Sequence, residues 1–348
     1  MNGSFTIKLL DKRKETVMEL PQVSRKYVTS RQELGSERAQ ALAEIFEQYE
    51  KLPALPNRIG FVSLYVTGRC HLQCPHCYAE EEFQGLIKDA STEQMARIIN
   101  GLSLLTNQIQ LTGGEIFVRT DPESRRNDVL LLVDEISRRN RETIVQTTGM
   151  HVTSSMLEFC ASRNVKWFSL SLDGPDAKSN SEIRGDDSAF TKTIALIPEL
   201  KRYGFKVKVG TTITSVTSDI NKIVQLGHMM VDLGVDNWKL TQFFGREVGR
   251  ASGLNADRMG VPDDTYRTIA EEALRMFGEK IRVTTHSLAD FYASPALLVQ
   301  PTGVVTVTQG TKDVFMGNIL TDQPETIIGQ LQSVNGLFTI TANAEKTY

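Results

Sequence analysis

The sequence predicts an α/β protein built on parallel β-strands. From Ile59 to Gln242, strand-like segments alternate with helical patterns and make up six βα units, which favours parallel strands joined by right-handed crossovers. Hydrophobic residues form 40% of the 348-residue chain and charged residues 23%, a composition typical of globular proteins. Because six units are fewer than the eight of a closed barrel, a partial barrel open on one side and a doubly wound sheet both fit the pattern.

The bulk properties of the chain exclude several classes of partner. The formal net charge is -3, so no strong positive field draws the protein to nucleic acid or to an anionic membrane. No apolar run approaches the roughly 20 residues that span a bilayer. The first residues lack the basic-then-apolar order of a secretory signal. We therefore expect a cytoplasmic protein with no nucleic-acid or membrane partner.

Residues 1–57 are expected to form an N-terminal extension. An alternating segment, Phe5–Leu10, predicts a short strand, and a charged stretch follows it. A helical pattern near Ala39–Tyr49 ends at Pro53 and Pro56, which mark a linker.

The six βα units follow the linker. The expected strands are Ile59–Thr67, Gln108–Thr112, Thr143–Thr147, Lys166–Leu172, Lys206–Thr214 and Asn237–Gln242. The expected helices are Thr92–Leu104, Asn127–Arg139, Ser154–Arg163, Ala189–Tyr203 and Asp219–Leu233. Ser91 and Asp219 are start signals for the first and last of these helices, because their side-chain oxygens accept hydrogen bonds from unpaired backbone amides.

The regular alternation of strand-like and helical segments ends at about residue 250. The remaining stretch predicts, in order, a helix over Asp263–Phe277 behind Pro262, a strand over Ile281–Thr285, a hairpin of Leu297–Gln300 with Val304–Thr308, and a helix that begins near Pro324. Residues 251–348 are therefore expected to form a small α+β extension.

Three of the four cysteines lie close together directly after the first strand of the α/β region. They follow the spacing Cys70-x-x-x-Cys74-x-x-Cys77, and Pro75 argues against a continuous helix through them. Parallel α/β folds place their chemistry at the carboxyl ends of strands. A loop at this position can wrap three thiolates around an iron–sulfur cubane and leave one of its four irons open.

Other interpretations of the cysteines remain open at this point. Three thiolates with His71 or His76 would suit a Cys3His zinc site, and Cys74-Pro75-His76-Cys77 has the C-x-x-C spacing of a redox dithiol. Three buried, unliganded cysteines are the third possibility. Cys160 lies on an expected helix and is interpreted as a packing residue.

The C-x3-C-x2-C spacing after the first strand resembles the signature of the radical S-adenosylmethionine (SAM) superfamily, over roughly residues 58–245. The resemblance implies a partial (β/α)6 TIM-like barrel over residues 58–250, with one [4Fe-4S] cluster on Cys70, Cys74 and Cys77 and with SAM as the second cofactor. Where the family often has an aromatic residue before the last cysteine, this chain has His76.

Further segments match family motifs that contact SAM. Leu111–Glu115 resembles the GGE motif, Gln146–Gly149 a turn that lines the site, Ser169–Gly174 the SxDG segment, Ile183–Gly185 an arginine turn, and Lys208–Thr212 an adenine-contacting segment. A surface position is the alternative for the arginine of that turn. The resemblance implies that the SAM-binding residues are His76, Gly113, Gly114, Glu115, Thr147, Ser169, Ser171, Asp173 and Arg184.

The resemblance also implies a mechanism. Family members cleave SAM reductively to methionine and a 5′-deoxyadenosyl radical, which removes a hydrogen atom from the substrate. No catalytic acid or base is assigned, because the radical comes from SAM. The electron is expected from a partner such as flavodoxin or ferredoxin.

The C-terminal stretch bears on the substrate. Leu298–Val305 and Gly317–Ile319 resemble a SPASM/twitch extension, yet no cysteine follows Cys160 to hold an auxiliary cluster. Because that branch modifies ribosomal peptides, the resemblance favours a peptide substrate in natural-product maturation. A sugar, nucleoside or amino acid is the alternative, and a non-catalytic Fe–S or zinc module is a third. His286 and Tyr292 are candidates for reaching the substrate, whereas Trp167 and Trp238 are expected in the core.

Overall fold

The computed structural model describes residues 6–11, 14–19, 60–77, 89–245, 257–293, 296–309 and 312–334. The first two segments are β1 (Thr6–Asp11) and β2 (Lys14–Glu19), which pair as an antiparallel hairpin. β1 confirms the strand expected at Phe5–Leu10, whereas β2 takes the place of the expected charged stretch. The helix predicted near Ala39–Tyr49 lies outside the described residues.

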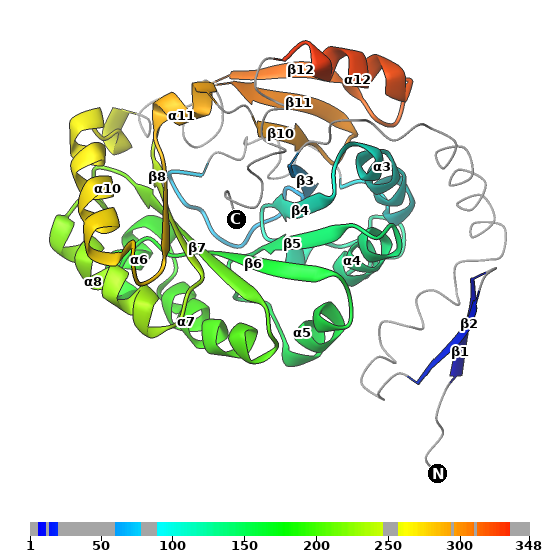
Figure 1. The fold of residues 1–348 in the computed structure, drawn as a ribbon, viewed down its shortest axis with the longest axis horizontal. Coiled ribbons are helices and arrows are strands. Elements are labelled where there is room, and N and C mark those ends of the chain that lie inside the picture. Colours follow the sequence, from blue (N-terminus) through cyan, green and yellow to red (C-terminus); the bar gives the residue numbers. More distant parts are fainter. Residues whose placement is uncertain are drawn as a thin grey trace.

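A ten-stranded sheet forms the body of the protein, in the order β12-β11-β10-β3-β4-β5-β6-β7-β8-β9 (Figure 1). The strands are β3 (Val62–Thr67), β4 (Gln108–Gly113), β5 (Glu142–Gln146), β6 (Val165–Ser171), β7 (Lys206–Ile213), β8 (Asn237–Gln242), β9 (Arg282–His286), β10 (Ala296–Val299), β11 (Val304–Gln309) and β12 (Lys312–Asn318). β3 to β9 are parallel and follow each other in chain order. This arrangement confirms the expected partial barrel, since β9 and β12 remain as two separate edges.

The end of the chain returns to the start of the sheet. β10 pairs in parallel with β3, and β11 and β12 continue from it as antiparallel strands. The hairpin of β10 and β11 confirms the predicted one, but its attachment to β3 and the third strand β12 were not predicted. One sheet therefore runs through both the barrel and the C-terminal stretch. The division at residue 250 stays a prediction.

Helices cover the outer side of the curved sheet (Figure 1). They are α3 (Thr92–Leu105), α4 (Val129–Arg138), α5 (Ser154–Ala161), α6 (Ala177–Arg184), α7 (Asp187–Arg202), α8 (Ile220–Asp232), α10 (Asp263–Phe277), α11 (Leu288–Ala293) and α12 (Pro324–Gln332), with the short 3-10 helix η3 (Ile116–Val118). The start signals operate as expected: Ser91 forms a capping box with Gln94, and Asp219 accepts from the Asn221 amide. α6 and α11 were not predicted.

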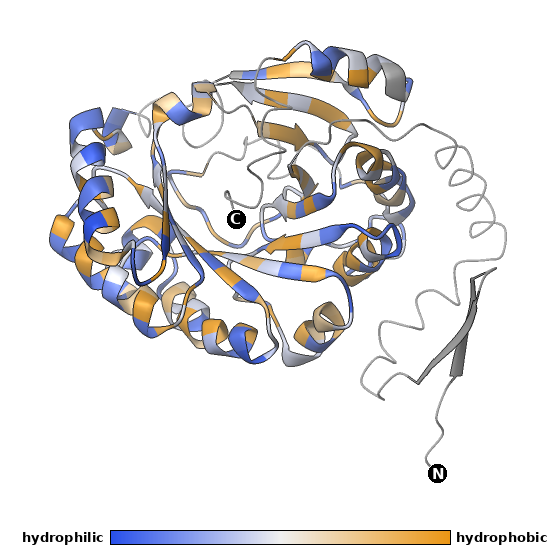
Figure 2. Cartoon of the chain, viewed as in Figure 1, coloured by the Kyte–Doolittle hydropathy of each residue, from blue (hydrophilic) through white to orange (hydrophobic). Residues whose placement is uncertain are grey.

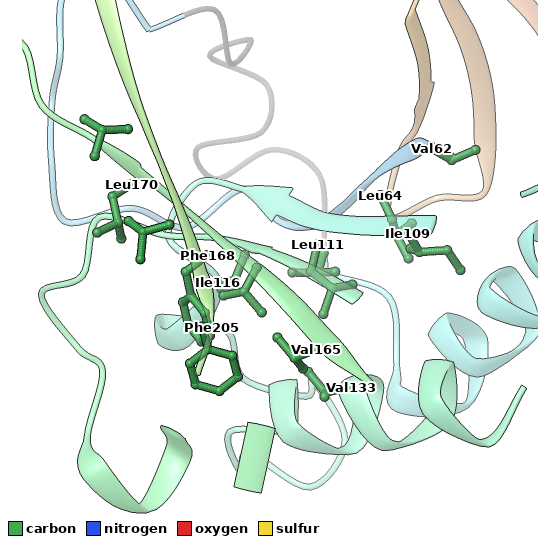
Figure 3. Close-up of a cluster of buried hydrophobic side chains, with 14 of the residues drawn as sticks. Val62, Leu64, Ile109, Leu111, Ile116, Val133, Val165, Phe168, Leu170 and Phe205 are labelled. Atoms are coloured by element: carbon green, nitrogen blue, oxygen red, sulfur yellow. The ribbon is translucent and has the colours of Figure 1, made fainter. Parts of the chain in front are cut away.

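The hydrophobic core lies between the sheet and these helices. Strand residues such as Leu111 and Phe168 are fully buried and pack in one cluster with helix residues such as Val133 (Figure 3). Hydrophobic residues also mark the strands and one side of the helices in Figure 2. The residues that alternate with these along each strand must therefore face the inner side of the sheet. None of the helices in the described part of the chain is long and apolar enough to cross a membrane.

Three residues were expected to pack in the core. Trp238 and Cys160 are fully buried in the main cluster, which confirms both expectations. Trp167 is 7% exposed and packs with Ile144 and the partly buried Phe61 in a separate small cluster.

A buried arginine ties the cysteine-bearing strand to two neighbouring elements. Arg119 is fully buried and contacts both Asp128 oxygens, at 2.9 and 3.1 Å. It also donates to the carbonyl of Val66, at the end of β3, and to that of Ala90, at 2.6 Å. Burial raises the pKa of Asp128, and the Arg119 guanidinium opposes that rise.

Replacing Arg119 is therefore expected to destabilise the fold strongly. Arg119→Met removes the buried cation that pairs with Asp128, whose carboxylate keeps the Thr92 hydroxyl as a donor, and it takes a donor from two buried carbonyl oxygens. We therefore expect the free energy of unfolding to fall by about 3–5 kcal/mol. Urea unfolding measures the change. The matched control is Arg97→Ala, which breaks the exposed pair with Glu93 on α3, at 2.8 Å, and is expected to cost about 0.3–0.5 kcal/mol. Equal losses in the two variants would contradict this role of Arg119.

Candidate functional site

The three clustered cysteines lie on the loop of residues 68–77, here called the cysteine loop, which leaves the carboxyl end of β3. Cys74 is buried, and Cys70 and Cys77 are half-buried. The Cys77 amide donates to the Cys74 carbonyl at 3.1 Å, and the Leu72 amide donates to the Cys70 sulfur at 3.4 Å. The structure thus brings the three expected ligands together on one short turn at the strand end.

A pair of glycines fixes the cysteine loop to the next strand. The Gly114 amide donates to the Thr67 carbonyl and the Glu115 amide to the Arg69 carbonyl, both at 2.8 Å. A Cβ atom on Gly113 would lie 2.3 Å from the Thr67 carbonyl oxygen, and one on Gly114 would lie 2.1 Å from that of Arg69. Gly113 also has a φ of 141°. Only glycine lets these two backbones approach so closely.

Glu115 joins the end of β4 to the end of β5. Its buried carboxylate accepts from the Thr147 hydroxyl at 2.7 Å, from the Phe117 amide at 3.1 Å, and from the amide and hydroxyl of Thr148 at 2.7 and 2.6 Å. Four donors fill the hydrogen-bonding capacity of a carboxylate. Glu115 and Thr147 therefore hold the rim of the site together, and their contact with SAM stays a prediction.

A charged network under the cysteine loop brings together three of the predicted residues. Arg184 Nε lies 2.6 Å from Asp173 Oδ2, without the angle of a hydrogen bond, and His76 Nε2 lies 3.7 Å from the same oxygen. The Arg184 guanidinium and carbonyl are 4.0 and 3.7 Å from the Cys74 sulfur. Arg184 is thus not the surface arginine that the sequence left open.

Burial and the neighbouring charges set the protonation states of His76 and Arg184 in this network. Burial lowers the pKa of His76 to about 4, with Asp173 opposing and Arg184 adding to the effect, so the imidazole is neutral. Burial also disfavours the Arg184 cation, but Asp173 and Cys74 outweigh this and raise its pKa. His76 Nδ1 is buried and has no partner among the described residues, so it is a polar atom still available to a ligand.

Asp173 is held in place by two further residues. The Thr212 amide on β7 donates to Asp173 Oδ1 at 2.8 Å, and the Asp173 amide donates to Asn180 Oδ1 at 2.9 Å. The predicted residues Ser169 and Ser171 precede it on the same side of β6.

Two positioning residues were missed by the sequence analysis. Asn180 lies on the unpredicted helix α6 and gave no sequence signal. Thr148 lies in the turn Gln146–Gly149, which the sequence analysis named as lining the site, but only Thr147 was singled out there.

The donor set suits an iron–sulfur cluster. Three thiols follow one parallel strand, and Cys74 and Cys77 both contribute to the electrostatic environment of Cys70. Burial raises the pKa of the Cys70 thiol to about 11, which a bound cation would reverse because iron binds the thiolate. Among the residues that the structure describes, no three Cys, His, Asp or Glu side chains form a group that could hold a metal ion. The assignment of the cluster to these thiols therefore stands on their chemistry and position.

Comparison with known proteins identifies the class to which this site belongs. Residues 64–224 match the family model described as the radical SAM superfamily. The match confirms the resemblance found in the sequence. The superfamily is one of enzymes that use a [4Fe-4S] cluster and SAM, and the donor set described above suits these cofactors.

Several characterised proteins are similar to the chain. It is 26% identical to the AdoMet-dependent heme synthase of Nitratidesulfovibrio vulgaris over 191 residues, which cover 55% of this chain and 49% of that protein. It is 28% identical to the subtilosin biosynthesis protein AlbA of Bacillus subtilis over 188 residues, 52% of this chain and 39% of that one. The chain spans about half the length of the first curated relatives that it matches.

Solved structures share the fold. The structure of Streptococcus suis SuiB bound to its precursor peptide SuiA superposes with a TM-score of 0.62 at 14% identity, over 87% of this chain and 74% of that one. At this identity the likeness supports the architecture of the described sheet and helices.

The inner face of the sheet beyond the cysteine loop is rich in basic side chains. Lys208 on β7, Lys239 on β8 and His286 on β9 lie on neighbouring strands, and Asp290 of α11 is near the latter two. Burial, Lys239 and Lys208 together lower the pKa of His286 to about 3, and Asp290 opposes them. His286 stacks edge-on against Phe291, at 4.1 Å between ring centroids.

The depressed pKa of His286 predicts a pH dependence of stability. Between pH 6.5, the ordinary value, and about 3, the unfolded chain binds a proton at His286 that the folded chain excludes. Stability must therefore fall as the pH drops below 6.5. Allowing for partial exposure, we expect a loss of about 1 kcal/mol from this residue between pH 7 and 5. Urea unfolding at both pH values should show a smaller loss for His286→Gln, and equal losses in the two proteins would refute the assignment.

Proposed function

We propose that the protein cleaves SAM reductively and uses the resulting 5′-deoxyadenosyl radical to remove a hydrogen atom from a substrate. The observation that carries the proposal is the docking of the cysteine loop on Gly113 and Gly114, with Arg184 beside Cys74. The cofactors, when bound, supply the electron and the radical.

The residues of the chain would position the cofactors. Cys70, Cys74 and Cys77 would hold the cluster, and Gly113 and Gly114 would fix the turn that carries them. The remaining predicted SAM-binding residues, His76, Glu115, Thr147, Ser169, Ser171, Asp173 and Arg184, would form the wall of the SAM site. Among these, His76 supports the proposal through its unsatisfied buried nitrogen.

A peptide is the proposed substrate, in the maturation of a ribosomal natural product. The support is the likeness to AlbA, a bacteriocin biosynthesis protein, and to SuiB, which was solved with a precursor peptide. A small molecule in a biosynthetic pathway is the second candidate, because the chain is also similar to heme synthases. We further propose a flavodoxin or ferredoxin as electron donor and a cytoplasmic location, where exposed thiols stay reduced.

The test is the formation of 5′-deoxyadenosine from SAM by the protein reconstituted with iron and sulfide and reduced without air. Formation supports the proposed chemistry, and its absence from a protein that carries the cluster would overturn it. To separate the two substrate classes, candidate peptides and small molecules are supplied with deuterium. Transfer of deuterium into 5′-deoxyadenosine identifies the substrate class.

A further inference from the structure

Two lysines occupy the inner face of the sheet, where the proposed chemistry does not use them. Outward residues of the same strands, Val207 and Val209 on β7 and Trp238 and Leu240 on β8, are buried in the core against the helices. Because side chains alternate along a strand, the lysines at 208 and 239 must project from the opposite face, into the barrel.

The register places both lysines close to the proposed SAM wall. Lys239 pairs with Gly210, which pairs with Ser171, and Lys208 pairs with Ser169. Ser171 is two residues before Asp173, a distance of about 7 Å along a strand. Lys239 is level with Ser171 and therefore lies inside the barrel, two residues away from Asp173 at the carboxyl end of the sheet. A substrate that is bound at this end and extends into the barrel reaches Lys239.

A glycine, Gly210, stands opposite Lys239 on the neighbouring strand and leaves room there. A Cβ atom on Gly210 would meet nothing closer than the Leu170 carbonyl oxygen, at 3.8 Å. The inner-face positions around it, Ser171, Thr212 and Thr284, are only half-buried. Among the described residues, the inner-face side chains at this level are thus only partly covered, as is expected where another molecule binds.

Lys239 also carries charge that the described residues balance only in part. Burial lowers the pKa of Lys239 to about 8. Burial also lowers the pKa of Lys208 well below its usual value, and the nearby Lys239 and Arg282 cations add to this effect. The acid that acts on Lys239 is Asp290, whose carboxylate already accepts from the Ser287 amide and hydroxyl, at 2.7 and 2.8 Å. Among the described residues Lys239 itself has no hydrogen bond or ion pair. An anion at this position would remove an unfavourable interaction.

We propose that Lys239, with Lys208 beside it on the next strand, binds an anionic group of the substrate, a carboxylate or a phosphate. The proposal rests on the proposed function, because it places the anion of a substrate whose reacting carbon lies nearer the cysteine loop. It narrows the substrate class to molecules that carry such a group a short distance from the hydrogen that is removed.

The test is protection of Lys239 from amine modification in the reconstituted protein. Acetic anhydride is applied at pH 8 with inorganic phosphate, with succinate, or with chloride at equal ionic strength, and the modified lysines are quantified by mass spectrometry. We expect phosphate or succinate to slow the modification of Lys239 at least about threefold, while Lys192, an exposed lysine of α7, is unaffected. Protection by one anion alone identifies the group, and equal rates in all three salts would overturn the proposal.

A variant gives a second, independent measurement. Phosphate or succinate should raise the thermal midpoint of the wild-type protein and of Lys192→Met by the same few degrees, and that of Lys239→Met by clearly less. An equal shift in Lys239→Met would overturn the proposal, and if this variant does not fold the protection experiment still decides. The formation of 5′-deoxyadenosine is measured in parallel. If the anions protect Lys239 but no 5′-deoxyadenosine forms, the proposed function is refuted and the anion site is not. If 5′-deoxyadenosine forms but the anions do not protect Lys239, the anion site is refuted and the proposed function is not.

Discussion

Cys74→Ala is expected to lose its iron and at least about 100-fold of its 5′-deoxyadenosine formation, because two thiolates do not hold a cubane that needs three from this chain. Cys74 is the buried member of the three cysteines and the one beside Arg184. Wild-type protein reconstituted without air should carry about four iron atoms per chain, and iron content and 5′-deoxyadenosine are measured together.

The matched control is Cys160→Ala. Cys160 is fully buried in the hydrophobic core, and burial raises the pKa of its thiol to about 12, so it is an inert packing residue. This variant should keep the full iron content even if it loses some stability. Retention of iron by Cys74→Ala, or its loss from Cys160→Ala, would show that the cluster has been placed on the wrong residues.

Gly114→Ala is expected to disrupt the site almost as strongly. The added methyl group would lie 2.1 Å from the Arg69 carbonyl oxygen and 3.1 Å from Cys70 Cβ, and no flexible side chain can yield at the first of these contacts. The cysteine loop must move away from β4, which breaks the hydrogen bonds of the Gly114 and Glu115 amides. We expect a loss of about 2–4 kcal/mol of stability, together with most of the bound iron.

Gly329→Ala is the control for this substitution. Gly329 lies on α12 and has nothing within 4 Å of the added atom, so alanine should leave the iron unchanged and stabilise the helix by up to about 1 kcal/mol. Comparable iron contents in Gly114→Ala and the wild type would mean that the loop does not depend on its contact with the glycine pair.

The parts of the fold that could be predicted are those with a strong apolar pattern. β8 and α10 begin and end where the sequence placed them, because Trp238 and Leu240 alternate and Tyr266, Ile269 and Ala273 form a helical stripe. α6 escaped prediction because only Ser179, Asn180 and Ile183 are buried along it, which is no apolar stripe. β12 was not predicted for a related reason, since its apolar residues do not form a buried face: Phe315, in its middle, is 62% exposed.

The site was predictable in its residues but not in its internal contacts. Motif spacing identified the three cysteines, the glycine pair, Asp173 and Arg184. It could not show that Arg184 faces Asp173 and Cys74, or that Glu115 bonds to two threonines on the next strand. These contacts join residues far apart in the chain, and they depend on strand register, which a local pattern does not contain.

The pairing of β10 with β3 has a consequence for the order in which the protein matures during synthesis. The strand that leads into the cysteine loop has one neighbour made soon after it, β4, and another, β10, made long after it. Since a growing chain folds from its N-terminus, that side of β3 stays uncovered until Val299 has left the ribosome. Before that moment the three thiols follow a strand that lacks one of its two neighbours, so cluster insertion is expected to wait until β10 has paired with β3.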